Sequence, residues 1–323
     1  MIKTFIRSCF VLILSFSLWP ELAAAQGFPS RPLKIVVGFA PGGSSDITAR
    51  AIADLLQKKL GQPVILENRP GAGGLTAAEQ VRKSPADGYT LLLVTSAHAV
   101  TGAMRRQMSF DPVNDFTWLS TLVTYGMVYG VRADSPYKSL GEFIAAAKAA
   151  PKSLSYYSVG TGTAHHLLGE WLNAAAGIEL VHVPYRGSAA ALADFIAGRV
   201  DLMIDTMTFA SPQTESGNVR PLAVTSQDRR GVMANVPFSG STVDGLAYES
   251  WLGLVGPKDL PADVAQLLTS AIREAASSPE FAAKMSPLGA TAKDSSPADF
   301  KSRVESDIER FKIVVKARAI GTE

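Results

Sequence analysis

The sequence has a single cysteine, Cys9, among its 323 residues, and this cysteine lies in an apolar N-terminal stretch. If that stretch is removed, no thiol remains for a disulfide, a thiolate metal site or a cysteine nucleophile. Histidine is also scarce, with four residues, and no Gly-x-Ser-x-Gly motif is present. We therefore predict that the protein is not an enzyme and that it uses no metal and no cofactor.

Charge of one sign is not concentrated anywhere in the chain. Residues 26–323 carry 29 Lys and Arg against 28 Asp and Glu, and no basic block or stripe stands out. Because nucleic-acid binding requires clustered cations that neutralise phosphates, a nucleic-acid partner is not expected. No segment after residue 25 reaches membrane-spanning length without charged residues.

The N-terminus has the pattern of an export signal. Lys3 and Arg7 form a positive region, Cys9–Leu18 is apolar, and Ala23-Ala24-Ala25 offers small residues for cleavage. We predict a signal peptide over residues 1–25 and a periplasmic mature protein. No cysteine follows the apolar run, so we do not expect a lipid anchor.

Strand-like and helix-like segments alternate along the rest of the chain, which indicates βα units around largely parallel sheets. Two apolar stretches, Phe116–Val131 and Trp251–Val255, are interpreted as crossings between two lobes. We therefore predict a discontinuous lobe 1, residues 26–125 plus 253–323, and a lobe 2 of residues 126–252. The predicted strands are Leu33–Val37, Val64–Glu67, Thr90–Thr95, Leu154–Val159, Leu180–Val183, Asp201–Asp205 and Pro221–Thr225. The predicted helices are Ile47–Leu60, Leu75–Lys83, Leu140–Ala149, Ala164–Ala176, Ala189–Ala197, Pro261–Ser277 and Ala298–Val315.

A glycine turn, residues 38–46, separates the first predicted strand from the first helix. It lacks the Lys-Ser/Thr of a nucleotide-binding P-loop. The N–H groups of Gly42, Gly43 and Ser44 would lie at a helix N-terminus, where unpaired donors and the helix dipole favour an anion. The alternative interpretation is a tight turn in which Ser45 or Asp46 only caps the helix.

A second turn of this kind, Gly160–Thr163, precedes the helix that contains His165 and His166. His166 and Glu170 are four residues apart and share a helix face, but no further metal ligand is nearby in sequence. The preferred interpretation is that one of the two histidines packs under the turn, with Glu170 as its partner. Two such turns suggest a small acid held between two lobes.

Seven motifs together resemble those of Bug-type receptors, the extracytoplasmic substrate-binding proteins of tripartite tricarboxylate transporters. They occur in the following order: Phe39–Asp46, Glu67–Gly74, Asp87–Tyr89, Gly160–Thr163 with His166-Leu167, Val183–Gly187, Arg220–Thr225 and Trp251–Leu254. The resemblance extends over nearly all of residues 26–323.

The resemblance implies an α/β, two-lobed periplasmic binding protein fold (type II-like) with a hinge and an interlobe cleft. It also implies a solute-binding protein, expected to be a monomer, that captures a small carboxylate and delivers it to transporter subunits of the inner membrane. Aromatic turn residues and few nearby cations favour a mono- or dicarboxylate over a tricarboxylate. The site residues that it implies are Phe39, Gly42, Gly43, Ser44, Asp46, Ser96, Gly160, Thr161, Gly162, Thr163, His166, Tyr185 and Asp205.

One segment, Val236–Gly245, departs from the family pattern, because Phe238 stands where the family usually has Thr. Two alternatives to the transport receptor stay open from sequence. A ligand sensor would pass the closed state to a signalling protein, and a periplasmic enzyme would convert a small acid. The residues do not name the ligand or the partner.

Overall fold

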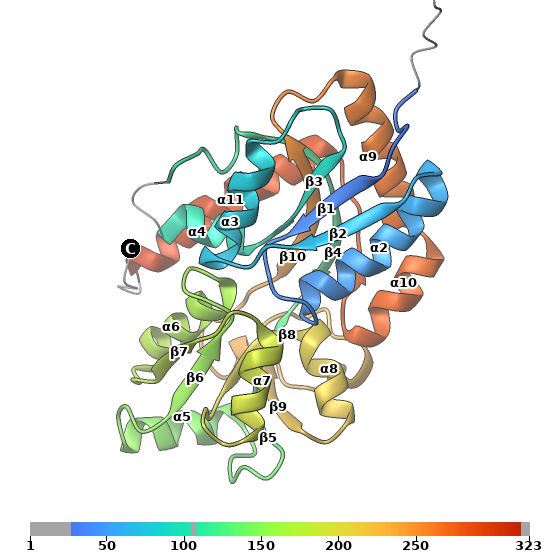
Figure 1. The fold of residues 1–323 in the computed structure, drawn as a ribbon. Helices are drawn as coiled ribbons and strands as arrows, with labels where there is room; N and C mark the ends of the chain where they lie inside the picture. Colours follow the sequence, from blue (N-terminus) through green and yellow to red (C-terminus); the bar gives the residue numbers. More distant parts are fainter. Residues whose placement is uncertain (1–26, 105–107, 318–323) are drawn as a thin grey trace, which may run out of the picture. The chain divides into compact units, whose positions relative to one another are not determined.

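The computed structural model describes residues 27–104 and 108–317. It divides into two compact units, Met1–Ser30 and Arg31–Glu323. Only residues 27–30 of the first unit are described, so the predicted signal peptide lies outside the described residues. All the elements below belong to the second unit (Figure 1).

A mixed six-stranded sheet, in the order β11-β4-β10-β3-β1-β2, forms one part of this unit. Strands β1, β2 and β3 are parallel, whereas β10 is antiparallel to both β3 and β4. The strands are β1 (Leu33–Val37), β2 (Val64–Asn68), β3 (Thr90–Thr95), β4 (Phe116–Tyr125), β10 (Ser250–Pro257) and β11 (Thr291–Ala292).

Helices cover both faces of this sheet, as Figure 1 shows. Helices α9 and α11 both pack against β4, and α2 packs against α9 and α10, while α4 packs against α11. Because both faces are covered, central strands such as Thr90–Thr95 are apolar at nearly every position. The helices are α2 (Ser44–Leu60), α3 (Leu75–Arg82), α4 (Ala97–Met104), α9 (Ala262–Ala276), α10 (Pro279–Met285) and α11 (Pro297–Ala317), with the short 3₁₀ turns η1 (Ala72–Gly74) and η4 (Ser286–Leu288).

The middle of the chain forms two smaller sheets. In the first, β5 pairs antiparallel with β8 and β9; in the second, β6 and β7 are parallel, and Tyr156 of β6 bridges to Leu202 beside β8. Buried aromatic side chains, among them Tyr157 and Phe195, fill the core here. The elements are β5 (Met127–Arg132), α5 (Leu140–Ala149), β6 (Ser155–Ser158), α6 (Ala164–Ala176), β7 (Val181–Pro184), α7 (Ser188–Ile196), β8 (Met203–Thr206), α8 (Met207–Glu215), β9 (Val219–Val224), η2 (Gly231–Met233) and η3 (Ser239–Ser241).

The chain passes from the large sheet to the small ones at Gly126, between β4 and β5, and returns in β10. Strands β1, β3 and β4 all end at the same edge of the large sheet, and β10 begins there, because Ser250 pairs with Tyr125 and Leu252 with Thr95. A strand that arrives from the small sheets must enter the large sheet at the end where β3 and β4 finish. It therefore runs antiparallel to both strands. This explains why the expectation of largely parallel sheets holds for β1–β3 and for β6 with β7, but is wrong for the crossing strands.

Most predicted elements are present within a few residues of their expected bounds, and Leu33–Val37, Thr90–Thr95, Leu140–Ala149 and Ala164–Ala176 match. The single predicted stretch Phe116–Val131 is two strands in two different sheets. The predicted lobe limits at residues 125 and 252 stay predictions; β10 belongs wholly to the large sheet from Ser250 onward.

Three helices, α4, α8 and α10, were not predicted. Helix α4 contains Gly102, and α8 contains Pro212, two residue types with poor helix propensity. Tertiary packing overrides that propensity, since α4 packs on α11 and α8 on β9. No helix in the described part of the chain is long and apolar enough to span a membrane.

Two helical glycines provide a test of packing between α6 and β6. A Cβ on Gly169 of α6 would overlap the buried ring of Tyr156, whereas a Cβ on Gly141 of α5 would meet only Ser139 Oγ, at 3.8 Å. We expect Gly169→Ala to lower the free energy of unfolding by about 1–3 kcal/mol through overpacking. Gly141→Ala is the matched control and should raise it by about 0.4–1 kcal/mol. Urea unfolding of both variants checks this, and equal effects would contradict the packing assignment.

Candidate functional site

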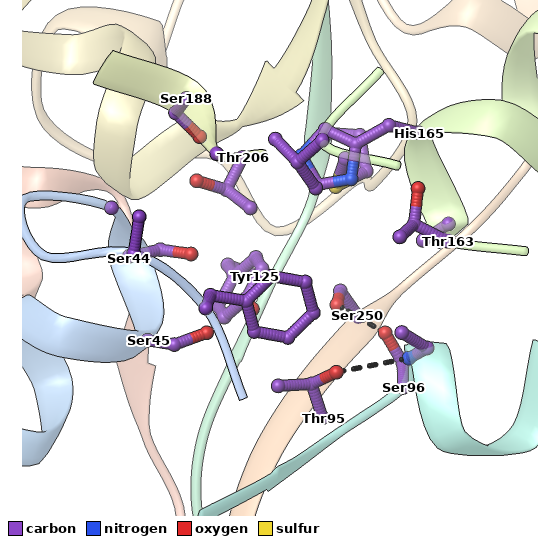
Figure 2. Close-up of a pocket in the computed structure, with 18 residues that line it drawn as sticks. Ser44, Ser45, Thr95, Ser96, Tyr125, Thr163, His165, Ser188, Thr206 and Ser250 are labelled. Atoms are coloured by element: carbon purple, nitrogen blue, oxygen red, sulfur yellow. Dashed lines mark hydrogen bonds between the residues drawn. The ribbon is translucent and has the colours of Figure 1, made fainter. Parts of the chain in front are cut away.

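A pocket lies where the large sheet and the small sheets meet, at the carboxyl ends of β3, β4 and β8 (Figure 2). Its space amounts to ≈ 480 Å³, part of it open to solvent. In open α/β folds, ligands bind at the carboxyl ends of strands, where loops and helix starts are exposed. The lining residues are Phe39, Ala40, Gly43, Ser44, Ser45, Thr95, Ser96, Ala97, Tyr125, Met127, Val159, Thr163, Ala164, His165, Gly187, Ser188, Thr206 and Ser250.

Helix N-termini dominate the wall of this pocket. In the described part of the chain, five helices (α2, α4, α6, α7 and α8) begin at or next to a lining residue. The first N–H groups of a helix have no partner within the helix, and the aligned peptide dipoles add partial positive charge at this end. Five such ends around one space favour an anion.

Four of the five helix ends show two ways in which the first N–H groups are satisfied. Thr163 Oγ1 accepts from the N–H of His166 at the start of α6, and Thr206 Oγ1 accepts from the N–H of Phe209 at the start of α8. Helices α2 and α7 instead have glycine N-caps, Gly43 and Gly187, with no side-chain cap. Their first-turn donors are therefore the ones best placed to bind a ligand oxygen.

The starts of α2 and α7 face each other, although the two helices pack against different sheets. A Cβ on Gly43 would lie 3.8 Å from Ser188 Oγ, and a Cβ on Gly187 would lie 3.1 Å from that of Ala40. Only glycine allows this approach at residue 187, where φ is +151°. The two backbone segments are thus held close enough for one small group to contact both.

The pocket is rich in hydroxyl groups and has no Lys or Arg among the described residues that line it. Figure 2 shows serine and threonine side chains on several sides of the space. Ser96 Oγ and Ser250 Oγ share a hydrogen bond of 2.6 Å. Burial raises the pKa of Tyr125 to about 12, so its phenol stays protonated at neutral pH. These neutral groups can bind an anion without burying an unpaired cation.

A fully buried carboxylate, Asp205, lies behind the pocket wall. It accepts hydrogen bonds from the hydroxyl of Tyr157 at 2.9 Å and from the N–H of Thr206 at 2.7 Å. His165 Nε2 lies 3.3 Å from the same carboxylate. Asp205 itself does not line the pocket, so only these neighbours connect it to that space.

Five residues from the predicted set line the pocket together. They are Phe39, Gly43, Ser44, Ser96 and Thr163. Thr163 is also structural, because its hydroxyl donates to the carbonyl of Gly160 at 2.6 Å as well as capping α6.

Gly42 and Asp46 lie in the first turn but do not line the pocket. Asp46 accepts from the N–H of Gly42 at 3.1 Å and from the side chains of Arg50 and Asn68. Burial would raise its pKa, but these hydrogen bonds outweigh burial and hold the pKa below its usual value. The structure therefore places Asp46 as the structural acceptor that holds the turn, and the N–H of Gly42 is already used.

Gly160, Thr161 and Tyr185 line a neighbouring groove that shares Phe39 and Val159 with the pocket. The hydroxyl of Tyr185 is occupied, since it donates to Asp194 at 2.8 Å. The carbonyl of Gly162 accepts from Thr101 Oγ1 at 3.1 Å. These residues are close to the pocket without forming its wall.

His166 also lies outside the pocket lining. Its Nδ1 accepts from the N–H of Gly162, and its ring stacks on that of His182 at 4.4 Å. The expectation that Glu170 partners a histidine of this helix is corrected: Glu170 accepts from the hydroxyl of Tyr156 at 2.7 Å. His166 therefore packs under the turn, and the other histidine, His165, faces the pocket. Among the described residues, no group of three or more potential ligands is arranged for a metal ion.

A serine–histidine pair is present between Ser158 Oγ and His182 Nε2, at 2.7 Å. Ser158 is fully buried, accepts from the N–H of Gly160, and does not line the pocket. A nucleophile must reach a reacting carbonyl, and this hydroxyl is enclosed. The pair therefore supports the turn rather than catalysis.

Several lining residues were missed from sequence. Ser188 follows the Pro184–Gly187 turn at the start of a helix, which is the same signal that identified the other two turns. Tyr125 and Ser250 sit at the two crossings between sheets, and no local pattern marks them. The divergent segment Val236–Gly245 contributes no residue to the described lining and packs instead beside β9, where the N–H of Val224 donates to Pro237 O.

Comparison with known proteins identifies the class and the family. The fold matches the solved periplasmic binding protein BugD, with a TM-score of 0.87 and 29% identity over 92% of this chain and 100% of BugD. The model of the tripartite tricarboxylate transporter family receptor matches residues 48–320, and the chain belongs to this family. Its members and structural neighbours are binding proteins rather than enzymes.

Two further relatives are similar over most of their length. The R. palustris protein Rpa4515, solved with adipate, is 33% identical with a TM-score of 0.87, over 91% of this chain and 99% of that protein. A UPF0065 protein from the tcbD-tcbE intergenic region of Pseudomonas sp. (strain P51) is 35% identical over 91% of this chain and 88% of its own length. The chain is therefore a solute-binding protein of the periplasmic binding class.

The stacked histidines under the second turn predict acid sensitivity. Burial lowers the pKa of His166 to about 4; burial, and then the neighbouring His166, lower that of His182 to about 4. The unfolded chain thus takes up protons at a higher pH than the folded one, so stability should fall as the pH drops from about 6.5 toward 4.

Urea unfolding between about pH 7 and pH 5 measures this loss before most carboxylates titrate. In His182→Gln the amide can keep a hydrogen bond to Ser158, and the loss should be smaller. If the wild-type protein and His182→Gln lose the same unfolding free energy between these pH values, other groups cause the acid sensitivity.

Proposed function

We propose that this chain is the substrate receptor that captures a small carboxylate, a mono- or dicarboxylate, in the periplasm for a tripartite tricarboxylate-type transporter. The observation that carries the proposal is the pocket in which five helix N-termini converge, two of them with glycine caps. Among the described residues, no Lys or Arg lines this pocket. Helix N-termini and neutral hydroxyls bind a carboxylate through several hydrogen bonds. The adipate held by Rpa4515 supports the same ligand class.

The proposed mechanism is closure of two lobes, residues 26–125 plus 253–323 and residues 126–252, around the ligand. Elements from both sides supply the pocket, with α2 and α4 on one side and α6, α7 and α8 on the other. Direct contacts such as Thr101 Oγ1 to the carbonyl of Gly162, 3.1 Å, join the two sides in the structure described here. A ligand that contacts both sides stabilises the closed arrangement through those extra contacts.

The proposed site within this pocket is the first turn with Phe39, Gly43 and Ser44, and the second turn with Thr163. Ser96 completes the predicted contacts, and the start of α7 at Ser188 joins them. The remaining predicted residues, including Asp46, His166 and Asp205, would act by holding these groups in place. We further propose that the receptor works as a monomer. Its signal peptide directs export and is then cleaved after residue 25.

A thermal-shift panel of small carboxylates, followed by calorimetric titration, tests the ligand class. At ~100 times its dissociation constant, a ligand adds about 2.7 kcal/mol of stability and visibly raises the melting temperature. We expect hits among carboxylates. Hits confined to uncharged solutes, or none at all, would contradict the receptor proposal.

A charge placed in the pocket tests the site itself. In Ser188→Asp a carboxylate would stand in the first turn of α7, where it suits the helix dipole but repels a bound anion. We expect the free protein to keep its stability and the affinity for the carboxylate to fall at least ~100-fold. Ser139→Asp is the matched control, because Ser139 caps α5 outside the pocket, and its affinity should be unchanged. Unchanged affinity in Ser188→Asp would place the ligand elsewhere.

A further inference from the structure

His165 has an unused hydrogen-bonding atom. The residue lines the pocket and is only 8% exposed. Its Nε2 lies 3.3 Å from Asp205 Oδ1, but its buried Nδ1 has no hydrogen-bond partner in the described part of the chain. A buried polar atom without a partner is costly, so such an atom in a binding pocket indicates a group that the ligand supplies.

The contact with Asp205 determines which nitrogen of His165 carries the hydrogen. Tyr157 donates its hydroxyl to Asp205, and burial and then the charge of Asp205 raise the pKa of Tyr157 well above its ordinary value. The N–H of Thr206 donates to the same carboxylate. Asp205 therefore acts as an acceptor, and its contact with His165 is favourable when Nε2 bears the hydrogen. In the neutral ring, Nδ1 then presents a lone pair and can only accept.

The protein offers little to satisfy that lone pair. Among the neighbouring lining hydroxyls, Thr163 donates to the carbonyl of Gly160, and Ser96 is paired with Ser250. Thr206 Oγ1 lies 3.4 Å from Asp205 Oδ1 and caps α8. Since no described protein group donates to this lone pair, a donor on the molecule that fills the pocket can pair with it.

We propose that the ligand is a small acid with an O–H or N–H donor on its carbon chain, and that His165 Nδ1 accepts from this donor. The inference rests on the proposed function, because it takes the carboxylate to bind at the helix N-termini. His165 then determines specificity: it distinguishes a hydroxy or amino acid from the unsubstituted acid of equal length. Asp205 is a positioning residue, which fixes the tautomer and orientation of the ring.

Two sets of acids that differ at one substituent provide the test. Propionate, lactate and alanine share three carbons, and succinate, malate and aspartate share four; within each set a hydrogen is replaced by hydroxyl or ammonium. Calorimetric titration near neutral pH gives each dissociation constant. In at least one set we expect the hydroxy or amino member to bind at least about tenfold more tightly than the unsubstituted one. Which of the two binds more tightly tells whether the donor is O–H or N–H.

Substitutions of His165 attribute this preference to Nδ1. In His165→Leu the preference, measured as the ratio of the two dissociation constants, should shrink to about twofold or less. In His165→Asn the amide oxygen offers an acceptor near the former Nδ1, and part of the preference should remain. Circular dichroism and urea unfolding check that both variants fold. If His165→Leu does not fold, the inference is tested by the wild-type comparison of substituted and unsubstituted acids and by the result for His165→Asn.

The outcomes separate this inference from the proposed function. If an unsubstituted acid binds as tightly as its hydroxy and amino counterparts, or more tightly, the inference is overturned and the carboxylate receptor stands. The same holds if His165→Leu keeps the full preference. If no carboxylate in a broad panel binds, the proposed function fails, and the inference fails with it.

Discussion

The unpaired N–H groups at helix N-termini are the constraint on which the rest of the site depends. Every helix must satisfy them, and here the helices that begin around the pocket do so in two ways. Threonine side chains cap α6 and α8, whereas α2 and α7 begin after Gly43 and Gly187, which have no side chain to offer. Around the pocket, helix starts with glycine N-caps and no side-chain cap therefore lie at two facing backbone segments. In the proposed function, a bound anion completes their hydrogen bonding.

The same constraint explains the shortage of charge in the pocket. An anion held by dipoles and hydroxyls needs no buried lysine or arginine, whose desolvation would be costly in the unliganded protein. The buried charge nearby, Asp205, is satisfied by donors from Tyr157 and Thr206. Asp46 is held in the same manner by Gly42, Asn68 and Arg50. Both carboxylates are used to fix backbone and side-chain positions rather than to contact the ligand space.

Sequence reasoning identified the two glycine turns, the alternation of strands and helices, and the stretch Phe116–Val131 that passes from one sheet to another. These features are local, since they depend on residues adjacent in the chain, such as the apolar run Leu33–Val37 followed by the turn at Gly42 and Gly43. The roles within a turn were harder to assign. Gly42 and Asp46 bond to each other inside the turn, and the ring that faces the pocket belongs to His165 and not to His166. A shift of one residue on a helix rotates a side chain by about 100°, which local pattern does not resolve.

By itself, the sequence determined the fold class, the family motifs and the position of each turn, because hydrophobic periodicity and glycine chemistry act over short distances along the chain. The tertiary structure decided which of those turns share one space. Tyr125 and Ser250 enter the pocket because β10 returns to the large sheet at the end where β3 and β4 finish. Ser188 enters it because the start of α7 lies against the start of α2. It also decided that Asp205 lies behind His165, 40 residues apart in sequence. Such contacts depend on how sheets pack, and no local signal carries that information.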